Sequence, residues 1–156
     1  MEQVTSKCSL KAIFSTAAIA AALTLSACST PADPDIKARQ DIMKNYGDAM
    51  GVMGGMAKEP STFDAEVFKE QAAYMAGDAA SPWSHFGNAE SVGKSTPAVW
   101  SNPEGFRAEA ENFQQVTAQL NETAQTATTI EQVLPAFGAV GDSCKSCHTD
   151  YKVKDD

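Results

Sequence analysis

The chain has 156 residues, with 12 basic and 20 acidic side chains and a formal net charge of −8 at pH 7. This length suits a single domain. The acidic balance argues against a nucleic-acid-binding protein, because phosphate backbones select basic surfaces. It is compatible with steering toward a basic partner protein, although an ordinary solvated surface has the same composition.

The first 27 residues have the pattern of a secretory signal peptide. Lys7 and Lys11 precede an apolar, alanine-rich stretch over about residues 12–25, which is too short for a membrane-spanning helix. Its end, Leu-Ser-Ala-Cys at residues 25–28, resembles the lipobox of bacterial lipoproteins. We therefore expect lipid on Cys28 and a periplasmic protein anchored to a bacterial membrane. An ordinary cleavage site with an incidental cysteine is the alternative.

Residues 28–34 contain two prolines among polar residues, and we expect a short tether there, followed by the folded part over residues 35–156. Removal of residues 1–27 takes away Glu2, Lys7 and Lys11. This leaves 10 of the 12 basic and 19 of the 20 acidic residues, a net charge of −9.

Helical periodicity first appears over about residues 35–58. Spacings of four and three predict one inner face, formed by Ile36, Gln40, Met43, Gly47, Met50, Gly54 and Ala57. The run also contains glycines, which weaken a helix by about 1 kcal/mol each relative to alanine. Such glycines indicate the close approach of another surface, such as a neighbouring helix, a second subunit or a bound group.

A second helical run follows from about residue 61 to residue 75. Ser61 and Thr62 are suited to cap it, and its predicted inner face contains Phe63, Val67, Gln71 and Tyr74. Residues 77–102 then form a long crossover. Because this crossover carries large rings, we expect it to pack over an apolar surface; the rings are Trp83, Phe86 and Trp100.

Two further helices are predicted after the crossover. The first begins at Asn102 and Pro103, a capping residue followed by proline at the first helical position; its inner face is Phe106, Ala110, Phe113, Thr117 and Leu120. The second has capping-box patterns beginning at Thr128 or Thr129, and Pro135 is expected to bend it or delay its start. Its predicted inner stripe is Leu134, Phe137, Gly141, Cys144 and His148.

The last helix contains Cys144-Lys145-Ser146-Cys147-His148, the C-x-x-C-H pattern that attaches a c-type haem. Positions i, i+3 and i+4 share one helix face. Cys144 and Cys147 can therefore form the two thioether bonds of one haem c, and His148 can be the proximal ligand of its iron.

Other uses of the cysteine pair are weaker. Zinc needs about four ligands, and this pair and two histidines are all that the chain offers after Cys8 and Cys28 are assigned. Thiol exchange of the thioredoxin type needs a βαβ setting. His85 is either a second axial ligand or a hydrogen-bonded packing residue.

Four helices joined by a short loop, a long crossover and another short loop indicate an all-α four-helix bundle. At this point the chain resembles the cytochrome c′ and cytochrome c-556 family, the class II c-type cytochromes. The resemblance covers about residues 35–154 and rests on the haem motif near the C-terminus together with weaker motifs. These are Arg39-Gln40 before Met43, Pro82-Trp83 before Phe86-Gly87, Pro97 before Trp100, and Phe137-Gly138.

The resemblance implies an antiparallel bundle, often dimeric, with haem between the first and last helices. It implies that Arg39 and Gln40 contact the haem, Arg39 through a propionate, and that Lys94 approaches the haem from the crossover. Lys152 stands where the family usually has arginine, so it keeps the charge but not the planar donor fork.

The resemblance also places Met43 on the distal side of the iron, where two outcomes differ. If the side chain only packs there, the iron is five-coordinate and can bind small gases such as NO or CO. If the thioether ligates the iron, the protein is a low-spin electron carrier of the c-556 kind. We expect the first, with gases or a redox protein as partners. We expect no enzyme, since no distal acid or base is evident beside Met43.

Overall fold

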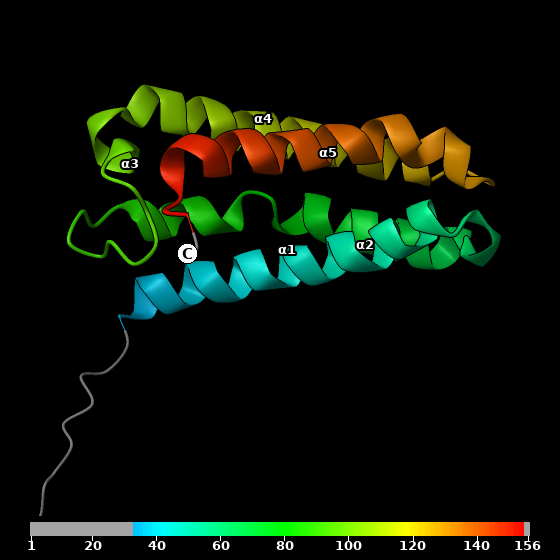
Figure 1. The fold of residues 1–156 in the computed structure, drawn as a ribbon, viewed down its shortest axis with the longest axis horizontal. Helices are drawn as coiled ribbons and strands as arrows, with labels where there is room; N and C mark the ends of the chain where they lie inside the picture. Colours follow the sequence, from blue (N-terminus) through cyan, green and yellow to red (C-terminus); the bar gives the residue numbers. More distant parts are fainter. Residues whose placement is uncertain (1–32, 155–156) are drawn as a thin grey trace, which may run out of the picture. The chain divides into compact units, whose positions relative to one another are not determined.

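The computed structural model describes residues 33–154. The predicted signal peptide, Cys28 and nearly all of the predicted tether lie outside this range. Four long helices make up the fold (Figure 1): α1 (Pro34–Lys58), α2 (Ala65–Asp78), α4 (Pro103–Ala124) and α5 (Ile130–Tyr151). Three shorter pieces lie in the connections: the 3-10 turns η1 (Pro60–Thr62) and η2 (Ser81–Phe86), and the one-turn helix α3 (Ala98–Ser101).

Successive long helices run in opposite directions along the bundle (Figure 1). Helix α4 packs against both α2 and α5, and α1 packs against α2. The predicted all-α antiparallel four-helix bundle is therefore confirmed. None of the helices described between residues 33 and 154 is both long and apolar enough to cross a lipid bilayer.

The helix starts follow local capping chemistry. Asn102 caps α4, and Thr129 forms a capping box with Gln132 at the start of α5. Pro135 lies inside α5 and does not delay its start. The predicted caps of α2 were wrong: Asp64 caps this helix, and Ser61 and Thr62 belong to η1.

The core lies where the four helices meet. Its largest fully buried apolar side chains are Met53, Phe68, Met75, Leu120, Val133 and Val140. The predicted inner face of α4 is confirmed for Ala110, Phe113, Thr117 and Leu120, which are all buried. Its first member, Phe106, is half-buried and lines the larger cavity described below.

On the other helices the buried face differs from the predicted one by about one residue. Helix α5 buries Val133, and the neighbouring Leu134 is 39% exposed. Helix α2 buries Met75, and the neighbouring Tyr74 is 39% exposed. Helix α1 buries Arg39, Tyr46, Ala49, Met53 and Met56. For α1 and α5, the site described below gives the reason.

Candidate functional site

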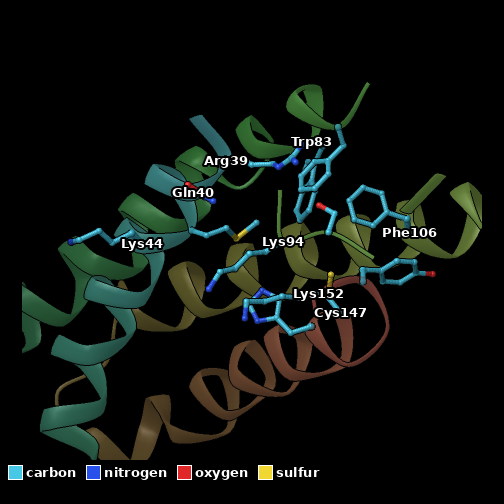
Figure 2. A pocket seen from close by; sticks show the side chains of 13 residues that line it. Arg39, Gln40, Lys44, Trp83, Lys94, Phe106, Cys147 and Lys152 are labelled. Atoms are coloured by element: carbon cyan, nitrogen blue, oxygen red, sulfur yellow. The ribbon is translucent and has the colours of Figure 1, made fainter. Parts of the chain in front are cut away.

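Two adjoining cavities, of about 540 Å³ and 260 Å³, are lined by residues from α1 and α5. Both are lined by Met43, Trp83, Cys147 and His148, so they form parts of one site. Ligand pockets in proteins usually measure roughly 300–1,000 Å³. Figure 2 shows the larger cavity.

Helix α5 presents the haem motif to this site. Cys144 and Cys147 are half-buried and both line the smaller cavity, and His148 lines both cavities. The motif was predicted to continue the core stripe of α5, and this holds for Cys144, which is partly buried against the core. The fully buried row of α5 lies one residue away, at Val140 and Ser143, and it resumes after the motif at Tyr151. Helix α5 therefore packs against α4 with one face and lines the cavities with the adjacent face.

Burial and nearby charges shift the pKa values of the two thiols and of the imidazole in the motif. Burial, with a smaller effect from the charge of Glu109, raises the pKa of Cys147 to about 11. Burial also raises the pKa of Cys144. Partial burial of the His148 ring, and then the charge of Lys152, lowers the pKa of His148. A neutral imidazole has a lone pair that can bind a metal.

Helix α1 forms the opposite wall. Gln40 and Met43 line the larger cavity, and Met43, Gly47 and Met50 line the smaller one. These residues belong to the face predicted as the inner stripe of this helix. That face lines the cavities and is only partly buried against the core, whereas the neighbouring face with Tyr46 is buried in the core, and Tyr46 also borders the smaller cavity.

Aromatic rings from the crossover and α4 close the site on another side. Trp83, Phe86 and Phe106 line the larger cavity, and the ring centroids of Phe86 and Phe106 are 4.9 Å apart. Trp83 Nε1 donates to the carbonyl of Ala79 at 2.7 Å, which fixes the indole. The prediction that the crossover rings pack over an apolar surface is confirmed for Trp83 and Phe86, whereas Trp100 lines a separate shallow groove.

Arg39 is 4% exposed and lines the larger cavity, but its guanidinium is held by the crossover. Nη1 donates to the carbonyl of His85 at 2.9 Å, and Nη2 donates to the carbonyls of Ser91 and Val92, the latter at 2.8 Å. The guanidinium carbon lies 4.7 Å from the centre of the Phe86 ring. The contact with a haem propionate stays a prediction.

The crossover is also joined to the end of α5. Thr96 donates from its backbone N–H to the carbonyl of Tyr151 at 3.0 Å and from Oγ1 to that of Asp150 at 2.7 Å. Ser95 and Lys152 form an isolated bridge. Lys94 and Lys152 therefore lie close together, and both line the larger cavity (Figure 2).

Gly93 makes the turn before Lys94. Its φ is +56°, and a Cβ atom there would lie 3.1 Å from both Arg39 Nη2 and Ile36 Cγ2. Glycine suits this position because of the positive φ, and its missing Cβ also leaves room for the close approach to α1.

His85 has the packing role that was one of its two predicted alternatives. Its Nδ1 lies 2.9 Å from Asp35 Oδ1, and its side chain is 31% exposed. It lines neither of the two cavities described above.

Several residues of the site were missed in the sequence. The larger cavity is also lined by Lys44, Ser95 and Tyr151, and the smaller one by Tyr46, Glu109 and Ser143. Glu109 Oε1 accepts from Ser146 Oγ at 2.8 Å, and its Oε2 atom is buried without a hydrogen-bond partner. No local motif singles out Glu109, because its position depends on how α4 packs on α5.

The chemistry of these residues fits a covalently bound haem. Two thiols and an imidazole on α5 face one site, and a thioether on α1 faces it from the other helix. The aromatic wall suits the porphyrin face. Lys94 and Lys152, which line the larger cavity, suit the two carboxylates of haem.

Known proteins agree with this site. The profile of the family described as Cytochrome C′ matches residues 35–152. Cytochrome c′ of Rubrivivax gelatinosus is 32% identical, over 76% of this chain and 94% of that protein. Cytochrome c-556 of Agrobacterium tumefaciens (strain apple 185) is 31% identical, over 76% of this chain and 94% of that protein.

Solved structures of cytochromes c′ also match. A ferrous variant from Alcaligenes xylosoxidans with bound NO has a TM-score of 0.72 and 30% identity, over 78% of this chain and 94% of that one. The Rubrivivax gelatinosus structure has a TM-score of 0.70 and 30% identity, over 76% and 94%. With the bundle and the site described above, these matches show that the chain belongs to the cytochrome c′ family and is a haem c protein of that type.

Proposed function

We propose that this protein binds a small uncharged gas, NO or CO, at a five-coordinate haem iron, and that it also exchanges electrons with a redox partner. Cys144 and Cys147 would hold the haem through thioether bonds, and His148 would be the proximal ligand. Met43 would cover the distal side without ligating the iron. When bound, haem supplies an iron that changes oxidation state and binds such gases.

The observation that carries this proposal is that Met43 on α1 and His148 on α5 both line both cavities. Met43 is partly buried and packs against the hydrophobic core, so its side chain already has apolar neighbours. The rings of Trp83 and Phe86 give the site an apolar wall, and an apolar wall favours an uncharged gas over an ion. A relative with bound NO agrees with this role.

A second candidate is a low-spin electron carrier in which the Met43 sulfur ligates the iron. The observation that favours it is the thioether at this position, since methionine with histidine is a common ligand pair in electron carriers. The match to a cytochrome c-556 agrees with it.

Optical spectra of the oxidised, reduced and CO-treated holoprotein separate the two candidates. We expect a high-spin reduced spectrum, rapid CO binding and little change in Met43→Leu. Met50→Leu is the matched control, because Met50 lines the smaller cavity and does not line the larger one. A low-spin spectrum with a sulfur-to-iron charge-transfer band that disappears in Met43→Leu would instead establish the electron carrier.

We propose that the protein acts as a gas-binding carrier and not as an enzyme, with export to the periplasm and a lipid on Cys28. The apolar stretch and the lipobox-like residues 25–28 support export and lipidation. The mass of the mature protein tests both, because it should begin at Cys28 and include the acyl chains. The family resemblance also supports a homodimer, which sedimentation equilibrium would test.

A further inference from the structure

The start of α1 is fixed to the crossover. Asp33 caps α1 by accepting from the backbone N–H groups of Asp35 at 2.9 Å and Ile36 at 3.2 Å. Its second oxygen accepts from Ser91 Oγ at 2.6 Å. The point at which the chain leaves the proposed tether is therefore held directly beside Val92.

Val92 belongs to an apolar surface at this end of the bundle. We call this surface the crossover face. It is a shallow groove of about 370 Å³, and its residues are Ala89, Val92, Pro97, Trp100 and Ser101. Val92 is 42% exposed. The crossover loop and α3 lie at the end of the bundle where α1 begins and α5 ends (Figure 1).

A second exposed valine lies near this face. Val153 is 49% exposed, and its backbone N–H donates to the carbonyl of Lys94 at 2.9 Å. Two of the most exposed large apolar side chains of the described residues thus lie at the end where the tether enters.

The length of the tether limits the distance between the crossover face and a lipid on Cys28. Four residues lie between Cys28 and Asp33. A fully extended chain spans at most about 3.6 Å per residue step, so the five steps from Cys28 to Asp33 reach about 18 Å or less. A lipid on Cys28 would hold the crossover face within that distance of the bilayer. At such a short range the effective concentration is high, so a weak apolar contact becomes populated.

We propose that the crossover face docks on the surface of the lipid bilayer, with Val92 among its apolar contacts. This rests on the proposed lipidation of Cys28.

Hydrogen exchange of the full-length, lipidated holoprotein in phosphatidylcholine nanodiscs tests this proposal. The three proteins to compare are the wild type, Val92→Asp and Val52→Asp. Val52 is the matched control, because it is 43% exposed on α1 and lies outside the crossover face. A carboxylate at a buried membrane contact is unfavourable. The substitution Val92→Asp should therefore prevent docking, and Val52→Asp should not. Thermal melting of both variants checks that each one folds.

We expect amides of residues 88–101 to exchange severalfold more slowly in the wild type and in Val52→Asp than in Val92→Asp. Equal exchange in all three proteins, with the acyl chains present in the intact mass, would overturn the docking and leave the anchor intact. An intact mass without acyl chains would overturn the anchor and the docking together.

Discussion

The substitution Arg39→Met tests how α1 holds the crossover. It removes a guanidinium that is 4% exposed and that donates to three backbone carbonyls, and it keeps most of the apolar stem. The Ser91 residue that provides one acceptor is 1% exposed, so its carbonyl does not regain a water molecule without local opening.

The expected loss follows from the geometry. A hydrogen bond from a charged donor contributes about 1.5–3 kcal/mol, so three would contribute roughly 4.5–9 kcal/mol if every acceptor stayed dry. Val92 is 42% exposed, and its carbonyl can bond to water instead. We therefore expect the free energy of unfolding to fall by about 3–5 kcal/mol, the usual cost of breaking a buried charged network.

Denaturant unfolding of the holoprotein, followed by far-UV circular dichroism, measures this loss. Lys37→Met is the control on the same helix, because Lys37 pairs with Asp41 at the surface and should change stability by only about 0.5 kcal/mol or less. Hydrogen exchange should also accelerate at the crossover amides of residues 88–96 in Arg39→Met. A loss below about 1 kcal/mol, with unchanged crossover exchange, would refute the reasoning.

Three further predictions concern stability. Val133→Ala should destabilise the holoprotein by about 1–3 kcal/mol and Leu134→Ala by clearly less, because Val133 is 0% and Leu134 39% exposed. Denaturant unfolding measures both losses, and equal losses would contradict the packing of α5. Thr129→Ala removes the capping box of α5 and should cost about 1 kcal/mol in the same assay, whereas an unchanged midpoint would argue against the cap. The hydrogen bond from Ser91 is the main reason why the pKa of Asp33 lies below its usual value of 3.8. The Asp33 carboxylate therefore stabilises the fold above pH 3.8, and this contribution is lost as the pH falls through the lower pKa of the folded state. Acid titration of stability should therefore be shallower in Asp33→Asn, and identical curves would exclude this contribution.

Local features of the sequence predicted the site well. The C-x-x-C-H motif and its helical spacing predicted three side chains on one face, and the structure brings all three to the cavities. The start of α4 at Pro103 was predicted because its capping signals lie within a few residues of each other.

The register of the buried faces was harder to predict, for a physical reason. Helices α1 and α5 each have a core face and a cavity face side by side, so apolar residues cover a broad arc of each helix. Periodicity alone does not divide such an arc, and the parts of the predicted stripes around Met43 and Cys144 line the cavities. The contacts of Arg39 could not be predicted from local sequence either, because its acceptors are 46 to 53 residues away in the sequence.

The central claim is that α5 carries a covalently attached haem c at Cys144 and Cys147. The most direct test is the intact mass and visible spectrum of the purified protein after extraction with acid and organic solvent. We predict that the polypeptide keeps the mass of one haem and its Soret absorption through extraction, and that the double variant Cys144→Ser, Cys147→Ser does not. If the haem of the wild-type protein passes into the organic phase, or if no haem is present, the claim is wrong.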